Sequence, residues 1–189
     1  QTAQSLPYGM PNSFIRSDMT ATNGWTQSGI STDYNSSGSN VKFDTTGDVA
    51  TLFLADSPGV LSFNLKGNSL SGSYVFTVLE SSNNSLYTTA LVVNTGIGTS
   101  NTVFSVSLLP TTRYVRWVYT TKATGNIGFG GVSIALSSNS PAIGVSTLST
   151  LTETNLNGSF IDVSLLNETF VSGQPTVSSF VLNNAPAGV

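Results

Sequence analysis

The sequence predicts an all-β protein built around an antiparallel two-sheet β-sandwich. Short runs rich in β-branched and aromatic residues alternate between apolar and polar positions, and glycine, proline and asparagine separate these runs. Helical spacing is nearly absent, so no helical crossover separates the runs. Because parallel strands need such crossovers, the pattern favours an antiparallel sandwich over a parallel α/β sheet.

Period-two alternation predicts the individual strands of this sandwich. In residues 60–66, Leu61, Phe63 and Leu65 share one face, between turn signals at 58–59 and 67–68. In residues 113–120, positions 115, 117 and 119 face the core, whereas Tyr114 and Arg116 lie on the opposite face. Further strands are predicted at 74–80, 86–93, 103–108 and 127–136, with a turn at 123–126. Six aromatic residues are predicted to lie in the core: Trp25, Phe63, Phe76, Phe104, Trp117 and Phe129.

Two domains are predicted. The first covers residues 1–136, a polar linker at 137–141 ends in Pro141, and the second covers 142–189. Only about three strands are predicted in the second domain, at 142–151, 160–166 and 177–182, whereas an immunoglobulin-like sandwich has about seven. We therefore expect the second domain to be incomplete and the chain to be a fragment of a longer protein. Its open strand edges predict packing against the first domain or self-association through the C-terminal tail.

The composition excludes several classes of function. The chain has no cysteine and no histidine, and only 8% of its residues are charged, so it lacks the usual thiolate nucleophile and the best ligands for zinc, copper and iron. A net charge of −3 with six scattered cations predicts no nucleic-acid binding. No apolar run approaches the ~20 residues of a membrane-spanning helix, so no membrane insertion is expected. The uncharged Ser/Thr/Asn-rich composition and the start at Gln1 favour a secreted or cell-surface protein.

The acidic residues do not predict an enzyme. Glu80, Glu153 and Glu168 are the only glutamates, and their positions suggest no carboxylate pair for glycoside hydrolysis. A Ser-His-Asp arrangement is excluded because histidine is absent. We therefore expect a non-catalytic protein.

One acidic turn is a candidate calcium site. Asp44 and Asp48 place two carboxylates around a tight turn, and Ca²⁺ takes six to eight oxygen ligands, including backbone carbonyls. Further carboxylates would have to come from neighbouring loops, and the candidates there are Asp18, Asp33 and Asp56. The alternative interpretation, which the sequence favours, is a turn whose aspartate accepts hydrogen bonds from its own backbone.

Exposed aromatic residues are the better candidates for ligand binding. A flat ring stacks on a sugar face while neighbouring polar groups bond the sugar hydroxyls. Tyr34 lies in a turn-rich stretch, Tyr87 begins a predicted strand, and Tyr114 shares a strand face with Arg116. These four residues form the predicted ligand site, although many such tyrosines are ordinary half-buried surface residues.

Five runs of the chain carry a resemblance to a known family, and they are residues 23–26, 41–43, 59–63, 114–117 and 128–134. In this order they resemble the jelly-roll modules of the cleaved-adhesin type, which occur in large exported proteins of Bacteroidetes-like bacteria and are similar in architecture to carbohydrate-binding modules. The resemblance covers about residues 12–136 and implies a jelly-roll sandwich. That family usually has two acidic residues where this chain has Gly130 and Gly131, so no calcium or ligand role is implied there. The tail, at 151–153 and 180–188, resembles the opening of immunoglobulin-like repeats and implies a partial immunoglobulin-like β domain at the C-terminus.

These observations predict a non-catalytic adhesion or glycan-binding module of a larger secreted or cell-surface protein, with a glycan or a surface protein as its partner. Two other classes also fit the composition. One is a structural spacer or accessory domain of a secreted hydrolase, and the other is a viral or phage surface β-sandwich. The full-length reading frame would distinguish these classes.

Overall fold

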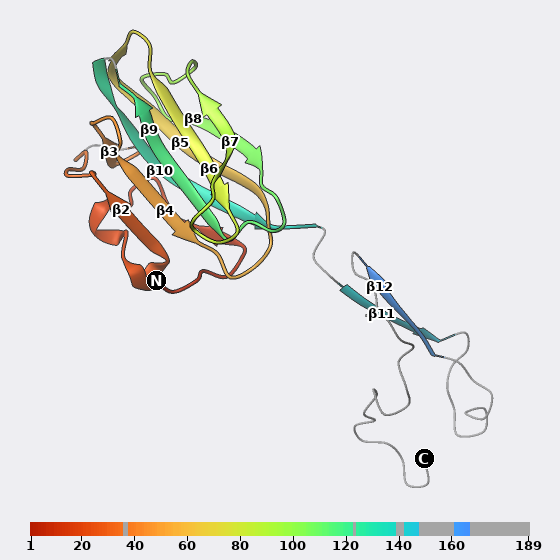
Figure 1. Cartoon of the computed structure of the whole chain (residues 1–189). Helices are drawn as coiled ribbons and strands as arrows, with labels where there is room; N and C mark the ends of the chain where they lie inside the picture. The colour runs from red at the N-terminus through yellow and green to blue at the C-terminus, as the bar shows by residue number, and fades with distance from the viewer. Residues whose placement is uncertain (36–37, 123, 139–141, 148–160, 167–189) are drawn as a thin grey trace, which may run out of the picture. The chain divides into compact units, whose positions relative to one another are not determined.

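The computed structural model describes residues 1–35, 38–122, 124–138, 142–147 and 161–166. The chain divides into two units, Gln1–Ser138 and Asn139–Val189. The first unit is the antiparallel two-sheet sandwich that the sequence predicts (Figure 1). Its described helices are two single 3₁₀ turns, η1 (Arg16–Asp18) and η2 (Ala21–Asn23), and no described helix is long and apolar enough to cross a membrane.

Each sheet of the sandwich has five strands. The β10 sheet contains β1 (Tyr8–Gly9), β3 (Val41–Phe43), β5 (Pro58–Ser71), β8 (Thr102–Ser107) and β10 (Thr124–Leu136). The β9 sheet contains β2 (Trp25–Ser28), β4 (Val49–Phe53), β6 (Val75–Ser81), β7 (Thr88–Val93) and β9 (Tyr114–Thr121), in the order β2-β4-β9-β6-β7. Consecutive strands alternate between the two sheets except at the β6–β7 hairpin, and this alternation is the arrangement of a jelly roll.

The core lies between the sheets and is largely aromatic. The predicted inward faces are confirmed, since positions 61, 63 and 65 of β5 and 115, 117 and 119 of β9 are fully buried. Five of the six predicted core aromatics are also fully buried, and the exception is Phe104. The prediction for Phe104 is correct only in part, because β8 is an edge strand and leaves its ring half-buried against Phe63.

Two predicted turns belong to strands instead. Residues 67–68 and 124–126 do not end the strands, because β5 and β10 continue to pair through Asn68 opposite Asn126 and Ser71 opposite Thr124. The register shifts between Thr124 and Asn126. Gly125 there has a φ of +73°, and a Cβ at this position would lie 2.3 Å from the Ser69 carbonyl oxygen. The glycine therefore forms a bulge within the ribbon, where the sequence pattern alone indicated a turn.

A buried glutamate fixes one crossing between the sheets. Glu80 of β6 is 7% exposed, and its Oε2 accepts hydrogen bonds from the Leu109 amide (2.9 Å) and the Thr112 hydroxyl (2.5 Å). Leu109 and Thr112 lie in the segment that carries the chain from β8 in one sheet to β9 in the other. Glu80 therefore has a structural role that its place at a strand end did not reveal.

The second unit contains two described strands, β11 (Ala142–Thr147) and β12 (Ile161–Leu166), which pair antiparallel with Ala142 opposite Leu166. They fall within two of the three strands predicted there, and the third, at 177–182, lies outside the described residues. Ser137, the first residue of the predicted linker, is buried, and its amide donates to the Ser57 carbonyl. The immunoglobulin-like character of this unit and the predicted domain limits remain predictions.

Candidate functional site

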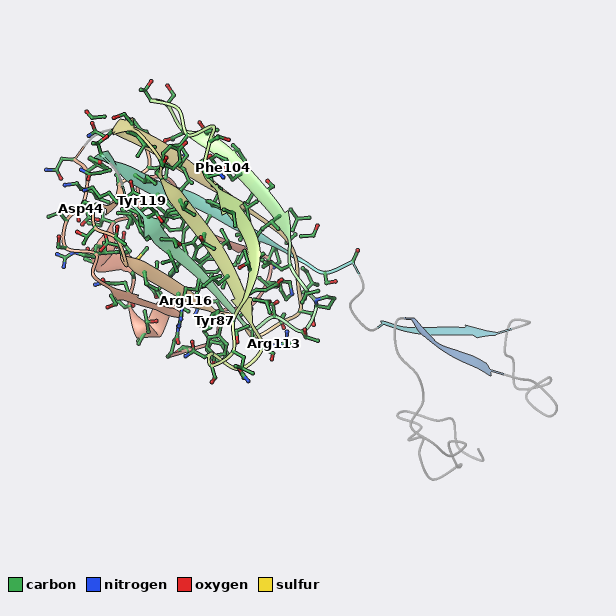
Figure 2. All side chains as sticks on the ribbon, turned by 45° about the horizontal axis from the view of Figure 1, so that its top comes forward. Asp44, Tyr87, Phe104, Arg113, Arg116 and Tyr119 are labelled. Carbon is green, nitrogen blue, oxygen red and sulfur yellow. The ribbon has the colours of Figure 1, made fainter. Side chains whose placement is uncertain are left out.

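Three of the four predicted ligand residues come together on the outer face of the β9 sheet. Tyr114 and Arg116 point outward because they alternate with the buried positions 115 and 117 of β9. Tyr87 comes from the β6–β7 hairpin, and the Arg116 guanidinium carbon lies 3.8 Å from the centre of its ring. Figure 2 shows the Arg116 and Tyr87 side chains next to each other, far from Asp44.

The guanidinium of Arg116 is held in place from two sides. Its Nε donates to the Thr51 hydroxyl on the neighbouring strand β4 (3.1 Å), and its Nη2 donates to Asn84 Oδ1 in the hairpin (3.4 Å). The Tyr87 hydroxyl donates to the same Asn84 oxygen. A guanidinium has five N–H donors, so this arrangement fixes the group while leaving donors for a ligand.

A second aromatic pair extends this surface. The Tyr114 ring stacks on Phe53, with the ring centres 4.5 Å apart and the planes 7° from parallel. Phe53 is directly opposite Tyr114 in the pairing of β4 with β9. Sequence reasoning missed Phe53, because residues 49–53 are almost all apolar and do not alternate with polar positions. We name Phe53, Tyr87, Tyr114 and Arg116 the aromatic platform.

The Tyr87 phenol stays neutral in this setting. Partial burial raises its pKa, the charge and hydrogen bond of Arg116 oppose this rise, and the neighbouring Tyr114 adds to it. The net result is a pKa above the usual value for tyrosine. Tyr87 therefore presents an uncharged ring to any ligand at neutral pH.

Tyr34 does not join the platform. It lies among residues of the β10 sheet, where Lys42 of β3 places its Nζ 5.8 Å from the centre of the Tyr34 ring. Partial burial raises the pKa of Tyr34, and the nearby Asn68, Asn126 and Lys42 side chains oppose this rise only in part. The Tyr34 hydroxyl is buried and has no hydrogen-bond partner among the described residues. The two groups of predicted ligand residues thus lie on different sheets, which the sequence pattern could not show.

In the turn at residues 44–48, an aspartate accepts hydrogen bonds from the backbone of its own turn, as in the alternative to a calcium site. Asp48 is 1% exposed, and its Oδ2 accepts hydrogen bonds from the amides of Asp44 (2.7 Å) and Thr45 (2.9 Å). Asp44 forms an ion pair with Lys42 at 3.1 Å. Partial burial opposes ionisation of Asp44, but the hydrogen bond and charge of Lys42 outweigh it, so its pKa lies below the usual value. Among the described residues, no three acidic side chains are grouped as metal ligands.

Calcium at this turn remains a proposal, and one measurement tests it. Asp48 Oδ1 is buried and has no hydrogen-bond partner among the described residues, so it is the oxygen that a cation would contact. If calcium binds the native protein there, the midpoint of thermal unfolding will be several degrees higher in calcium than in excess chelator. Equal midpoints would contradict the proposal and leave Asp48 as a turn cap.

Gly130 and Gly131 have a steric explanation. A Cβ at Gly130 would lie 3.0 Å from the Asn12 backbone, and a Cβ at Gly131 would lie 2.3 Å from Asn64 Nδ2. Gly131 also has a φ of +58°. A side chain at either position would therefore require the neighbouring Asn12 or Asn64 to shift, and at Gly131 the positive φ would add backbone strain.

Comparisons with known proteins give a likeness of fold. No protein-family model and no curated protein matches the chain. One similar solved structure is a mutant of CBM29-2, a family 29 carbohydrate-binding module studied for its ligand recognition. It is 13% identical to this chain with a TM-score of 0.43, and the match covers 59% of this chain and 81% of that one. The module CpGH89CBM32-6 produced by Clostridium perfringens is 18% identical with a TM-score of 0.40, covering 61% of this chain and 95% of that one.

A third solved structure contains a module together with an enzyme. The CBM22-1 and GH10 modules of endo-1,4-β-D-xylanase 10B from Clostridium thermocellum, complexed with xylohexaose, are 17% identical with a TM-score of 0.44, covering 64% of this chain and 27% of that one. Each likeness is to a carbohydrate-binding module or to a structure that includes one. The strand order and pairing of this chain establish its fold.

Proposed function

We propose that the sandwich is a non-catalytic glycan-binding module and that the aromatic platform is its binding surface. The observation that carries the proposal is the Arg116 guanidinium, held over the Tyr87 ring at 3.8 Å beside the stacked Tyr114–Phe53 pair. Such a module would act in adhesion or substrate attachment within a larger secreted or cell-surface protein.

The chemistry of the platform suits a neutral sugar. Aromatic faces attract the C–H face of a pyranose ring, and a fixed guanidinium donates hydrogen bonds to its hydroxyls with little further loss of side-chain freedom. Catalysis by a carboxylate pair has no support at this surface. Glu80 is buried and bonded to Leu109 and Thr112, and Glu153 and Glu168 lie outside the described residues.

Glycan binding is expected to depend on individual platform residues. On an array of neutral glycans, with the protein presented multivalently, Tyr87→Ala and Tyr114→Ala should each weaken binding, because a stacked ring contributes about 1 kcal/mol, about fivefold in Kd. Arg116→Lys keeps the charge but loses the planar group, so it should weaken binding similarly.

Tyr34→Ala is the matched control, because it removes the same atoms from the other sheet. Binding of neutral glycans should be unchanged in this variant. An array without any signal, from protein with an unchanged melting curve, would overturn the proposal. It would favour a structural spacer of a secreted hydrolase or a viral or phage surface domain.

We also propose that the chain self-associates through the strands of its second unit. Among the described strands, β11 and β12 pair only with each other, and an isolated pair of strands is marginal in water. Within the described residues neither outer edge of this pair has a strand partner, and such an edge can accept a further strand. We expect light scattering to give a dimer or larger species for this chain and a monomer for a version cut at Ser140. A monomeric full chain would contradict self-association.

A further inference from the structure

The three lysines of the chain lie near Tyr34, two of them on strands of the β10 sheet and the third in the connection from β9 to β10. Lys42 of β3 and Lys66 of β5 both lie opposite Gly128 of β10, so they flank the same position on the outer face. Lys122 donates from its Nζ to Asn126 Oδ1 at 3.0 Å, one row further along β10. The sequence shows these lysines only as isolated charges, and the strand register brings them together.

A hollow of about 480 Å³ opens beside Lys66. It is lined by Gly38, Lys66, Thr99, Ser100 and Asn101, and a small adjoining pocket shares Lys66 and adds Tyr34, Ser39 and Asn68. The described lining residues are glycine, polar or basic, and none is acidic. The hollow is open to solvent, and Thr99, Ser100 and Asn101 in its lining are exposed, so it can receive one end of a larger ligand. We name the two pockets together the lysine groove.

The charge of Lys66 is not compensated within the described residues. Lys42 is paired with Asp44 at 3.1 Å, and Lys122 donates to the Asp44 carbonyl and to Asn126. Lys66 has no ion pair or hydrogen bond with a described residue, although it is half-buried. Gly38 lies beside this ammonium, since a Cβ there would be in ordinary van der Waals contact with the Lys66 Nζ at 3.6 Å.

A second donor points to an anion as well. Asn101 Oδ1 accepts hydrogen bonds from the amide and the hydroxyl of Ser39, both at 3.1 Å. The backbone amide can only donate, so these bonds identify the Asn101 oxygen and leave its Nδ2 as the donor end. The groove thus offers an ammonium and an amide donor together, with no described carboxylate in its lining.

We infer that the lysine groove binds the carboxylate or sulfate group of an acidic saccharide. The ammonium of Lys66 and Nδ2 of Asn101 would receive the anionic oxygens, and Ser100, Thr99 and Asn68 would bond the ring hydroxyls. Charge-assisted hydrogen bonds are the stronger kind, and the half-buried Lys66 would donate them to the anion. This inference does not rest on the aromatic platform, which lies on the other sheet.

Calorimetry with the full chain tests the inference. The probes are an oligogalacturonate for carboxylate, a sulfated galactan oligosaccharide for sulfate, and an unsulfated galactan oligosaccharide as the neutral counterpart. At least one acidic probe should bind, the neutral one should bind far more weakly, and Lys66→Gln should weaken the acidic interaction by about tenfold. The acidic probe that binds identifies the anionic group.

Lys42→Gln is the matched control, because it removes the same charge from the same sheet but from a lysine paired with Asp44. Its effect should be no more than about twofold, as expected for a screened charge. An NMR titration of the unmodified protein gives a second readout, in which the Asn101 side-chain amide signals should shift with the acidic probe. Failure of both acidic probes to bind, equal effects of the two lysine variants, or unmoved Asn101 signals would each overturn the inference. None of these outcomes bears on neutral-glycan binding by the platform.

Discussion

Replacing Phe129 with alanine is expected to lower the free energy of unfolding by about 3–5 kcal/mol, the range for a large aromatic removed from a packed core. Phe129 of β10 is fully buried at the centre of the aromatic cluster between the two sheets. Its ring centre lies 5.2–6.5 Å from those of six others, namely Phe14, Trp25, Phe43, Phe63, Phe76 and Trp117. Urea unfolding followed by tryptophan fluorescence would measure the loss.

Two variants serve as controls for this prediction. Phe129→Leu keeps most of the buried apolar volume and should cost clearly less than the alanine variant. Phe104→Ala removes the same ring from edge strand β8, where it is half-buried, so it should also cost less. If Phe129→Ala and Phe104→Ala lower the free energy of unfolding equally, the prediction is wrong. The ring of Phe129 would then contribute no more to stability than a half-buried ring at the sheet edge.

Glu80→Ala is expected to have the second largest effect, a loss of about 2–3 kcal/mol. The Leu109 amide and the Thr112 hydroxyl would both lose their acceptor, and Thr112 is itself 2% exposed. A buried donor left without a partner costs about 1–3 kcal/mol, and hydrogen bonds to charged groups are the stronger ones. Denaturant unfolding measures the loss, and hydrogen exchange of the Leu109 amide should become faster.

The variant Glu80→Gln tests the charge of residue 80 apart from its hydrogen bonding, because it removes the charge and keeps one acceptor oxygen. Its remaining side-chain oxygen can still accept one of the two bonds, so the variant should be more stable than Glu80→Ala. Equal stability of the alanine variant and the unmodified protein would show that solvent replaces the carboxylate at no cost. The crossing from β8 to β9 would then be held by other contacts.

Local pattern predicted the parts of the fold that depend on neighbours in sequence. Alternation alone placed Val115 and Trp117 inside and Tyr114 and Arg116 outside, because the side-chain period of a strand is two. It failed at residues 67–68, where glycine and asparagine indicate a turn. There the pairing of β5 with a strand near residue 126 continues the strand, and such a partner is not visible locally.

The candidate sites were also predictable only as far as neighbours in sequence determine them. Tyr87 and Arg116 are 29 positions apart in sequence and meet only because the hairpin folds over β9. Tyr34 has the same chemistry as Tyr87, yet it lies with the β10 sheet, and no property of the residue itself indicates which sheet it joins. Asp48 Oδ2 accepts two amide hydrogen bonds of its own turn, a contact that the spacing of Asp44 and Asp48 allowed but could not show, and the calcium proposal concerns its other oxygen.

The alternation of strands between the sheets also determines how this chain must fold. Only the β6–β7 pair of the sandwich joins consecutive strands, whereas Leu65 pairs with Phe129 and Tyr8 pairs with Ile134. To pair strands that are distant in sequence, the chain must first close the long loop between them. This closure costs conformational entropy before the compensating contacts have formed. Folding of the sandwich is therefore expected on the slow scale of all-β domains, about milliseconds to seconds, and among its described strands only the hairpin that carries Tyr87 joins neighbours in sequence.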